Sequence, residues 1–526
     1  DIAEETLGSG PGSPDSDGDG IPDLAELKAG QSPTDTTPLP TGVLATTDTS
    51  GVARDVVVAR DHAFIADDTW GLAVMRLEEG RTPVRVAQLP SSSPVVRVAA
   101  DGNWLATAQG DGGLVLHDIT NPAQPVERHR LQEPDVHAVA IRLPWVFAST
   151  GADLRVIHLP TLQVRAQLPV ADGTTAVHDL AADGEWLYVL TDSRLVTFRV
   201  ENGLPFTTSS VAITGRTAPL ELGRKLLVAG PRLYVGYFEG YSILDRSDPA
   251  RPVLTGRQPA TQGAIHHLAA ASPRLLMPVT SFGGTATLAL SLYDVADATD
   301  VTRFLVSFNT PGEARAAVPH RGLAYVADGP AGLAVVNFIS RSADPQPPSV
   351  QLAGRWTLPN PRVEPEALLE IPVEADDNQL VRDVALLVDG ARVARDGSYP
   401  FTFTTTAPPA TNARTHFTLA AVATDLMGNA RTSTPVTVTL ATDATPPLVT
   451  AIAPAGGSEV PQAFFDGLEV TFQEPPASLP PNTLQLLDPG PDAVPGTADD
   501  VPVAGGPVQL EDRTLRWRTT APLAAR

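Results

Sequence analysis

A unit of about forty residues recurs along the middle of this chain, and it constrains the fold more than any other feature of the sequence. Residues 53–77 read ARDVVVARDHAFIADDTWGLAVMRL, and residues 314–338 read ARAAVPHRGLAYVADGPAGLAVVNF. Each copy holds three short β-rich runs, with a tight turn after the first and an Ala-Asp turn with a glycine after the second. Units of this kind bury their apolar faces against one another, so the copies are expected to pack side by side.

The central residue of the second run recurs seven times, first in three steps of 41 residues and then in steps of 42 to 49. These residues are Phe64, Leu105, Val146, Leu187, Tyr234, Leu276 and Tyr325. A fourth run closes most units, as in residues 84–89 (VRVAQL) and 126–131 (VERHRL). Four short strands at this period are typical of propeller blades. The sequence therefore predicts an all-β protein with a seven-bladed β-propeller over residues 40–340.

The seventh copy stops after its third run, because Phe338 is followed by the Pro-rich stretch SRSADPQPPS. Residues 42–48 (GVLATTD) precede the first copy as VAQL precedes the second, and they can supply the missing strand. Closing a ring in this way removes the open sheet edges that invite aggregation. We therefore expect the N-terminal strand to complete the last blade.

The units resemble the LVIVD repeats of bacterial surface propellers. The matching residues are Tyr325-Val326-Ala327-Asp328 with Gly332-Leu333, and the unit ends His117–Pro122 and Leu244–Pro249. The resemblance is strongest in units one, two, five and seven. The resemblance implies a propeller on a cell surface or in an extracellular space. It does not imply any particular activity, since a fold does not by itself define a function.

Residues 15–26 (DSDGDGIPDLAE), within an acidic linker at residues 1–39, follow the EF-hand loop pattern with Gly20 at the sharp turn. Hard oxygen ligands at alternate positions let one loop wrap a Ca²⁺ ion. The predicted ligands are Asp15, Asp17, Asp19, Ile21 through its carbonyl, Asp23 and Glu26. No helix can precede this loop, so it resembles the half EF-hands of thrombospondin type 3 and dockerin-like repeats. Calcium would stiffen the linker; the alternative is a plain solvated acidic segment.

Behind the propeller, residues 347–442 read as alternating strands of an immunoglobulin-like β-sandwich. Residues 425–430 (DLMGNA) resemble a turn of bacterial Ig-like modules, and residues 445–526 look like a second such module that is incomplete. Asp376 and Asp377 could join a calcium site, although a solvated turn fits them better. In the acidic loop 488–501, Asp492, Asp499 and Asp500 could hold a cation, but their spacing is irregular.

A basic residue recurs where the innermost strand of each blade begins, so one mouth of the channel would carry a basic collar. Its members are Arg54, Arg97, His137, His178, Arg224, His266 and Arg315. The collar could bind an anion or carboxylate ligand. The alternative is a set of structural ion pairs, Arg54 with Asp67 and Arg315 with Asp328, each 13 residues apart. A metal site of three histidines is conceivable, but Arg224 falls between two of them.

Catalysis needs a convergent set of groups, and the sequence offers few. Asp67 and Asp328 occupy equivalent positions in neighbouring blades, so a glycosidase-like pair is conceivable. The Ala-Asp turn belongs to the repeat itself, which weakens that idea, and no phosphate loop, HExxH or GxSxG motif is present. We therefore expect a binding protein and no enzyme; the alternative is an extracellular hydrolase or lyase acting on a polysaccharide.

The amino-acid composition limits the classes of molecule that the protein can be expected to bind. With 60 acidic and 37 basic residues the net charge is −23, which repels nucleic-acid phosphates. The absence of cysteine excludes disulfides and thiolate chemistry. No apolar run in this segment is long enough to span a bilayer. The expectation is part of a longer bacterial protein, secreted or on the cell surface, that serves in adhesion or as a structural spacer, with a protein or glycan ligand on a propeller face and the Ig-like modules as a stalk.

Overall fold

A computed structural model provides the structure of the protein. It describes residues 40–77, 82–170, 176–213, 224–257, 263–281, 288–340, 346–410 and 414–441, together with residues 16 and 23 and the C-terminal segments 449–453, 467–472, 487–488, 501–503, 505–511 and 514–519. Strands dominate these segments, and a short 3₁₀ turn, η2 (Gly354–Thr357), follows the first strand of the sandwich described below.

Between residues 42 and 337, the described segments form seven four-stranded antiparallel sheets. Sheet 1 contains β2 (Asp55–Ala59), β3 (His62–Ala66), β4 (Leu72–Arg76) and β5 (Val84–Leu89); sheet 2 contains β6 (Arg97–Asp101), β7 (Trp104–Ala108), β8 (Leu114–Asp118) and β9 (Val126–Leu131); sheet 3 contains β10 (Val139–Arg142), β11 (Trp145–Thr150), β12 (Asp153–His158) and β13 (Gln163–Pro169). Sheet 4 contains β14 (Val177–Asp183), β15 (Trp186–Thr191), β16 (Arg194–Glu201) and β17 (Leu204–Ala212); sheet 5 contains β18 (Lys225–Ala229), β19 (Arg232–Tyr237), β20 (Gly240–Asp245) and β21 (Val253–Arg257). Sheet 6 contains β22 (Ala264–Ser272), β23 (Leu275–Ser281), β24 (Leu288–Asp294) and β25 (Phe304–Asn309); sheet 7 contains β26 (Ala316–His320), β27 (Leu323–Ala327), β28 (Leu333–Asn337) and β1 (Gly42–Thr47).

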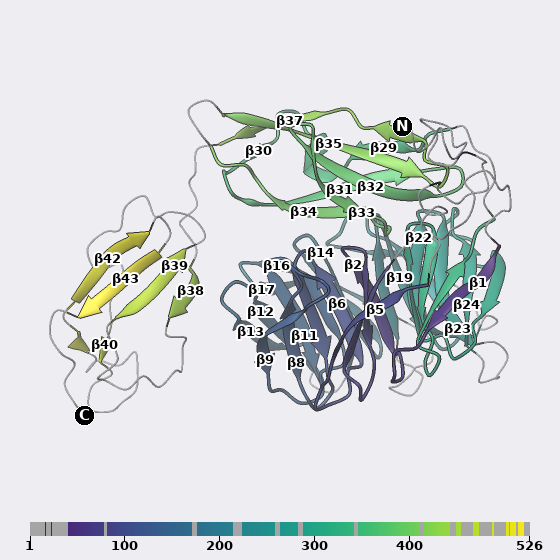
Figure 1. Ribbon diagram of the computed structural model, residues 1–526, viewed down its shortest axis with the longest axis horizontal. Coiled ribbons are helices and arrows are strands. Elements are labelled where there is room, and N and C mark those ends of the chain that lie inside the picture. The colour runs from purple at the N-terminus through teal and green to yellow at the C-terminus, as the bar shows by residue number, and fades with distance from the viewer. Residues whose placement is uncertain are drawn as a thin grey trace.

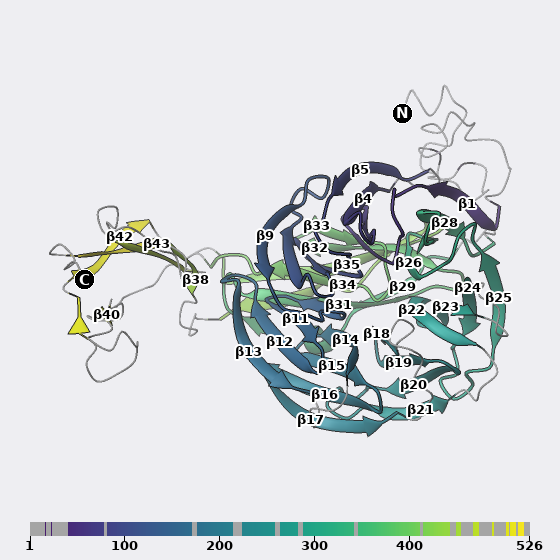
Figure 2. The same cartoon turned by 90° about the horizontal axis from the view of Figure 1, so that it is seen from below.

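The seven sheets form a closed ring, which Figure 2 shows in a view through its centre. The innermost strand of each sheet contacts the innermost strand of the next, from β2 through β6, β10, β14, β18 and β22 to β26, and β26 contacts β2 again. No sheet of the ring therefore lies at an open end.

Burial follows the position of a strand in its sheet. The two middle strands are covered on both sides by neighbouring sheets, so β27 is buried along its whole length and reads as an apolar run. The seven residues that mark the repeat all lie on second strands and are at most 3% exposed. The outermost strands face solvent, and every position of β9 is exposed or half-buried. The repeat is thus the signature of strands packed between sheets.

The last sheet is completed by the start of the chain. β1 pairs with β28, with Gly42 opposite Asn337 and Thr47 opposite Leu333. A Cβ on Gly332 would lie 2.3 Å from the carbonyl oxygen of Thr47, just as a Cβ on Gly71 would lie 2.1 Å from that of Leu89 in sheet 1. Both glycines have positive φ, which glycine adopts without steric cost. The N-terminal strand therefore occupies the same place as an ordinary fourth strand.

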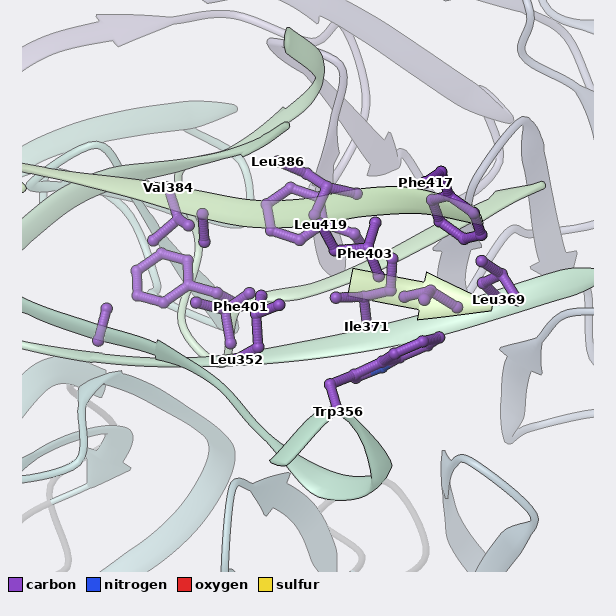
Figure 3. Packing of buried hydrophobic residues seen from close by; sticks show 14 of the residues in the cluster. Leu352, Trp356, Leu369, Ile371, Val384, Leu386, Phe401, Phe403, Phe417 and Leu419 are labelled. Carbon is purple, nitrogen blue, oxygen red and sulfur yellow. The ribbon is translucent and has the colours of Figure 1, made fainter. Parts of the chain in front are cut away.

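Residues 349–440 form a two-layer β-sandwich. One sheet contains β29 (Ser349–Leu352), β31 (Leu368–Asp376) and β34 (Thr402–Thr406). The other contains β30 (Arg362–Val363), β37 (Val436–Leu440), β35 (His416–Asp425), β32 (Val381–Val388) and β33 (Ala391–Asp396), with β36 (Ala430–Thr432) beside β35. Figure 3 shows the core between them, where Ile371 and Phe403 of the first sheet meet Val384 and Leu419 of the second. The alternating burial of β31 produces this arrangement, since one face of the strand meets the core.

This sandwich lies on one face of the ring (Figure 1), the face formed by the turns between first and second strands. Arg142 donates to a carboxylate oxygen of Glu370 at 3.2 Å, and the backbone N–H of Arg321 donates to the carbonyl of Gly397 at 2.8 Å. Leu426 of the sandwich belongs to the same buried cluster as residues of sheets 6 and 7. The first module behind the ring therefore covers it, and the expected stalk must be corrected: a stalk would leave that face free.

The C-terminal residues add a separate sheet of β38 (Val449–Ala453), β39 (Leu468–Phe472), β43 (Thr514–Thr519) and β42 (Gly505–Glu511), with the short pair β40 (Leu487–Asp488) and β41 (Val501–Pro502). Val470, Phe472 and Leu515 form its small buried cluster. This sheet lies beside the ring and the sandwich in both views (Figures 1 and 2).

Candidate functional site

The two faces of the ring differ in what covers them. We call the face under the sandwich the covered face, and the opposite one, with the loops between second and third strands, the open face. The innermost strands begin on the open face, so the predicted collar belongs to this side (Figure 2). Any ligand that approaches the channel along its axis without moving the sandwich meets the open face first.

Three collar residues lie at the surface of the open face, and each has an acidic partner. Arg54 pairs with Asp68 at 2.9 Å. The side chain of His137 contacts Asp135 at 2.5 Å, and both side chains are more than half exposed. Arg315 pairs with Glu313 at 2.8 Å. The basic groups are thus balanced by carboxylates, and the surface they form has mixed charge.

Three further collar residues are more enclosed. The His178 side chain, only 3% exposed, contacts the carboxylate of Asp192. Arg224 is buried and donates to the carbonyl of Ile213 at 3.3 Å. Burial, together with the nearby cations of Lys225 and Arg315, lowers the pKa of His266 to about 4, so this imidazole is neutral at pH 7.

Arg97 departs from the predicted collar, because its side chain lies in a buried ionic cluster inside the channel. Its guanidinium is 3.2 Å from Asp179 and 3.8 Å from Asp55. Lys225 and His267 complete this channel cluster, with His267 at 3.9 Å from Asp55. Burial lowers the pKa of Lys225 to about 8 and that of His267 to about 3. The cluster joins sheets 1, 2, 4, 5 and 6 around the channel axis.

The channel cluster was missed by sequence reasoning, although a signal for it exists. Asp55, Asp179, Lys225 and His267 each follow a predicted collar residue directly. Successive side chains of a strand point to opposite sides, so the residue after a collar position can point elsewhere. Arg97 is the first residue of β6, as Asp55 is the first residue of β2, and it therefore belongs to the inner set.

The two repeat aspartates do not form the ion pairs expected within their blades. Asp67 accepts a hydrogen bond from the hydroxyl of Thr49 at 2.6 Å, and Asp328 accepts one from Thr310. Each partner lies 18 residues before its aspartate, and both carboxylates are fully buried. Burial raises the pKa of Asp67 to about 6, with the Thr49 hydrogen bond opposing this shift. Both acids hold the loop that leads into their own innermost strand.

Two exposed aromatic side chains stand on loops of the open face. Trp70, between β3 and β4, is 54% exposed, and Phe238, between β19 and β20, is 44% exposed. Aromatic side chains are enriched at the energetic centres of interfaces, and binding residues are often carried on loops that a rigid scaffold positions. They were not singled out from the sequence, where each reads as one more residue of a turn.

The predicted calcium ligands lie outside the described residues, apart from Asp23. The carboxylate of Asp23 accepts hydrogen bonds from the backbone N–H and the hydroxyl of Ser16, both at 2.6 Å. Asp492, Asp499 and Asp500 also lie outside the described part of the chain. Within that part, no group of three or more His, Asp or Glu side chains is arranged to hold a metal ion.

The acidic residues singled out in the sandwich serve in turns and contacts. Asp376 pairs with Arg274 of the ring at 3.0 Å, and Asp377 accepts the backbone N–H of Gln379 at 2.9 Å. Asp425 accepts the backbone N–H groups of Met427 and Asn429, at 2.9 and 2.8 Å. These bonds are typical of aspartate in turns.

The closed ring of four-stranded sheets makes this a β-propeller protein. Three of its segments, residues 50–75, 95–132 and 224–258, match the LVIVD repeat. They fall in the first, second and fifth units, where the resemblance was predicted to be strong; the seventh unit, for which the same was predicted, is not among the matched segments.

Solved propeller structures are similar to the chain at low identity. The β-propeller domain of Cps50 (Swd1) from Myceliophteria thermophila is 14% identical, with a TM-score of 0.46, over 56% of this chain and 99% of that one. For U3-55K the identity is 14% and the TM-score 0.44, over 56% and 97% of the two chains. The WD40 repeats of RRP9 are 13% identical with a TM-score of 0.46, over 56% and 98%.

No curated protein matches the chain in sequence. Within the described residues, no helix has both the length and the apolar character needed to cross a membrane.

Proposed function

We propose that this chain is a bacterial binding protein, secreted or displayed on the cell surface, whose open propeller face is an interaction platform. One observation carries the proposal: the sandwich covers one face of the ring, while the other presents Trp70 and Phe238 to solvent. A rigid ring that holds exposed aromatic side chains on loops suits recognition of a protein or glycan.

In this proposal the seven sheets are the blades of a seven-bladed propeller and the two modules behind it are immunoglobulin-like. The two-layer sandwich supports the assignment of the first module. Since that module contacts the ring, only the C-terminal module is left as a spacer. The proposed Ca²⁺ loop at residues 15–26 stiffens the linker before the ring, and the EF-hand spacing of its acidic residues supports it.

We propose that the platform binds its ligand without chemical turnover. The one pair of acids that suggested a glycosidase, Asp67 and Asp328, is fully buried. Each carboxylate accepts hydrogen bonds from its own loop. A glycosidase needs both carboxyl groups at the scissile bond, so the buried pair does not favour the alternative of a polysaccharide hydrolase or lyase.

Binding of the full chain to an immobilised panel of bacterial and plant glycans and extracellular proteins tests this function. The double variant Trp70→Ala/Phe238→Ala should lose about tenfold or more of the affinity of any ligand that the wild type binds. Phe206→Ala is the matched control, because Phe206 is 52% exposed but lies on the outer strand β17. Equal binding by wild type and double variant would contradict the platform. Release of reducing ends from a polysaccharide, lost in Asp67→Asn, would favour the hydrolase.

A further inference from the structure

A second candidate site lies between the ring and the sandwich, on the covered face. It is a cavity of about 680 Å³. Its walls come from the first turn of sheet 3 (residues 142–145), the first turn of sheet 4 (residues 183–186) and the sandwich around η2. This volume is in the usual range for pockets that bind small molecules. We call it the junction pocket.

Two indole rings of the propeller line the junction pocket. Trp145 is the first residue of β11 and Trp186 the first residue of β15, so the repeat places them at equivalent positions of neighbouring sheets. Both are half-buried. Trp145 is held from behind by His158, with ring centroids 4.8 Å apart, and it packs closely on Gly203. The ring of Trp145 is therefore held in place, and Trp186 packs against the buried cluster of sheets 4 and 5.

The sandwich contributes an arginine held over a buried tryptophan. The guanidinium of Arg355 lies 4.5 Å from the ring centre of Trp356. Trp356 is fixed in turn, because its indole N–H donates to the carbonyl of Glu370 at 2.8 Å. Arg355 itself is exposed, and the charged group that acts on its guanidinium in the described part of the chain is Glu370.

The other charged groups of the pocket are already engaged. Arg142 bonds to Glu370, and Arg246 bonds to Asp183. Glu185 accepts a hydrogen bond from Arg199 at 2.9 Å. Among the described residues that line the pocket, Arg355 is therefore the cation that can donate its N–H groups to a ligand.

We propose that the junction pocket binds an acidic saccharide, with a hexuronate ring on the indoles and its carboxylate on Arg355. The face of an indole carries negative charge density and attracts the C–H groups of a sugar ring. A guanidinium binds a carboxylate through two parallel hydrogen bonds. The carboxylates of Glu185 and Glu370 already accept hydrogen bonds from arginines, but they keep lone pairs to which sugar hydroxyls can donate, whereas a purely apolar ligand would cover them without adding a hydrogen bond.

The pocket has room to extend the ligand. A neighbouring cavity of about 1020 Å³ shares Arg142, Asp183, Arg246 and Pro372 with it. A short uronate oligomer could therefore continue along the junction, and it would contact the ring and the sandwich together. This site is distinct from the open face, on the other side of the ring.

Titration calorimetry and tryptophan fluorescence of the full chain test the proposal. The probes are glucuronate, galacturonate and trigalacturonate, with glucose, galactose and a neutral trisaccharide as matched controls. The uronates should bind about tenfold more tightly than the neutral sugars, since one charge-assisted pair contributes about that factor. Arg355→Gln should abolish this preference, and Trp186→Ala should weaken the binding of every uronate.

Two controls separate this site from other effects. Uronate binding that weakens in Trp70→Ala but keeps its preference in Arg355→Gln would place the ligand on the open face, so failure of the platform and failure of the junction pocket are distinguishable. Trp186→Phe keeps an aromatic ring, and recovery of binding in this variant would exclude a folding defect in Trp186→Ala. The proposal is overturned if no uronate binds, or if Arg355→Gln retains the preference of the wild type.

Discussion

Replacing Arg97 by methionine tests whether the channel cluster holds the ring together. The change removes the guanidinium between Asp55 and Asp179, whose side chains are only 6% and 12% exposed. The carboxylates cannot easily turn to water, because Asp55 accepts the N–H of Val98 at 3.1 Å and Asp179 that of Leu226 at 2.9 Å. Methionine keeps most of the side-chain volume, so the variant changes charge more than packing.

The expected cost follows from leaving two buried carboxylates with the Lys225 ammonium as their remaining charged partner. Removing one member of a buried ion pair typically costs about 3–5 kcal/mol of unfolding free energy. Unfolding entropy is roughly 2 cal/mol/K per residue, or about 0.6 kcal/mol/K for a ring of about 300 residues. The melting temperature of the ring should therefore fall by about 5–8 °C. Differential scanning calorimetry and urea unfolding of the full chain measure both quantities.

A surface pair gives the matched control. Arg128 and Asp118 are 2.8 Å apart, closer than Arg97 and Asp179, but the Arg128 side chain is 51% exposed. Arg128→Met should cost less than about 1 kcal/mol, since water screens exposed pairs. Adding Asp179→Asn to Arg97→Met should restore part of the stability, because a neutral amide is less costly to bury than an unpaired carboxylate. The reasoning would be refuted if Arg97→Met and Arg128→Met lost equal unfolding free energy, or if the double variant Arg97→Met/Asp179→Asn were less stable than Arg97→Met.

Three further predictions follow from other parts of the chain. The unfolding free energy should rise between pH 8 and 10, because the pKa of Lys225 is about 8 in the folded protein and 10.5 in the unfolded chain, which therefore binds more protons in this range. Urea unfolding measured across this pH range should show the rise in the wild type and not in Lys225→Met. Gly397→Ala should loosen the sandwich from the ring, because the new Cβ would lie 2.6 Å from Cγ of Arg321, and the radius of gyration measured by X-ray scattering should increase. The control Gly506→Ala places its Cβ in open space and should leave the radius of gyration unchanged. Glu26→Gln should weaken Ca²⁺ binding by calorimetry, and binding unchanged from the wild type would contradict the proposed loop ligand.

The sequence predicted which part of each innermost strand carries the collar residues, but an error of one position along a strand could not be detected. The collar positions of Arg54, His137 and Arg315 do lie at the open surface. Arg97 was assigned to the same set, yet it lies in the channel, because a strand turns successive side chains to opposite sides and a slip of one position changes the side. No single copy of the repeat shows which register its strand adopts.

The architecture of the ring is legible in the sequence because every copy meets the same surroundings. A second strand is always packed between two neighbouring sheets, so Phe64 and Tyr325 recur as buried apolar residues at a regular interval. The unfinished seventh copy and the strand-like residues 42–48 point to their pairing, since both would otherwise leave an open edge.

The covered face and the junction pocket were decided by the tertiary structure alone. Arg142 and Glu370 meet across 228 positions of sequence, and nothing periodic marks either of them. The docking of the sandwich depends on such single contacts between surfaces that fold from different segments. A repeat encodes how equal units pack on one another, whereas the meeting of two unlike domains depends on their shapes and charges in three dimensions.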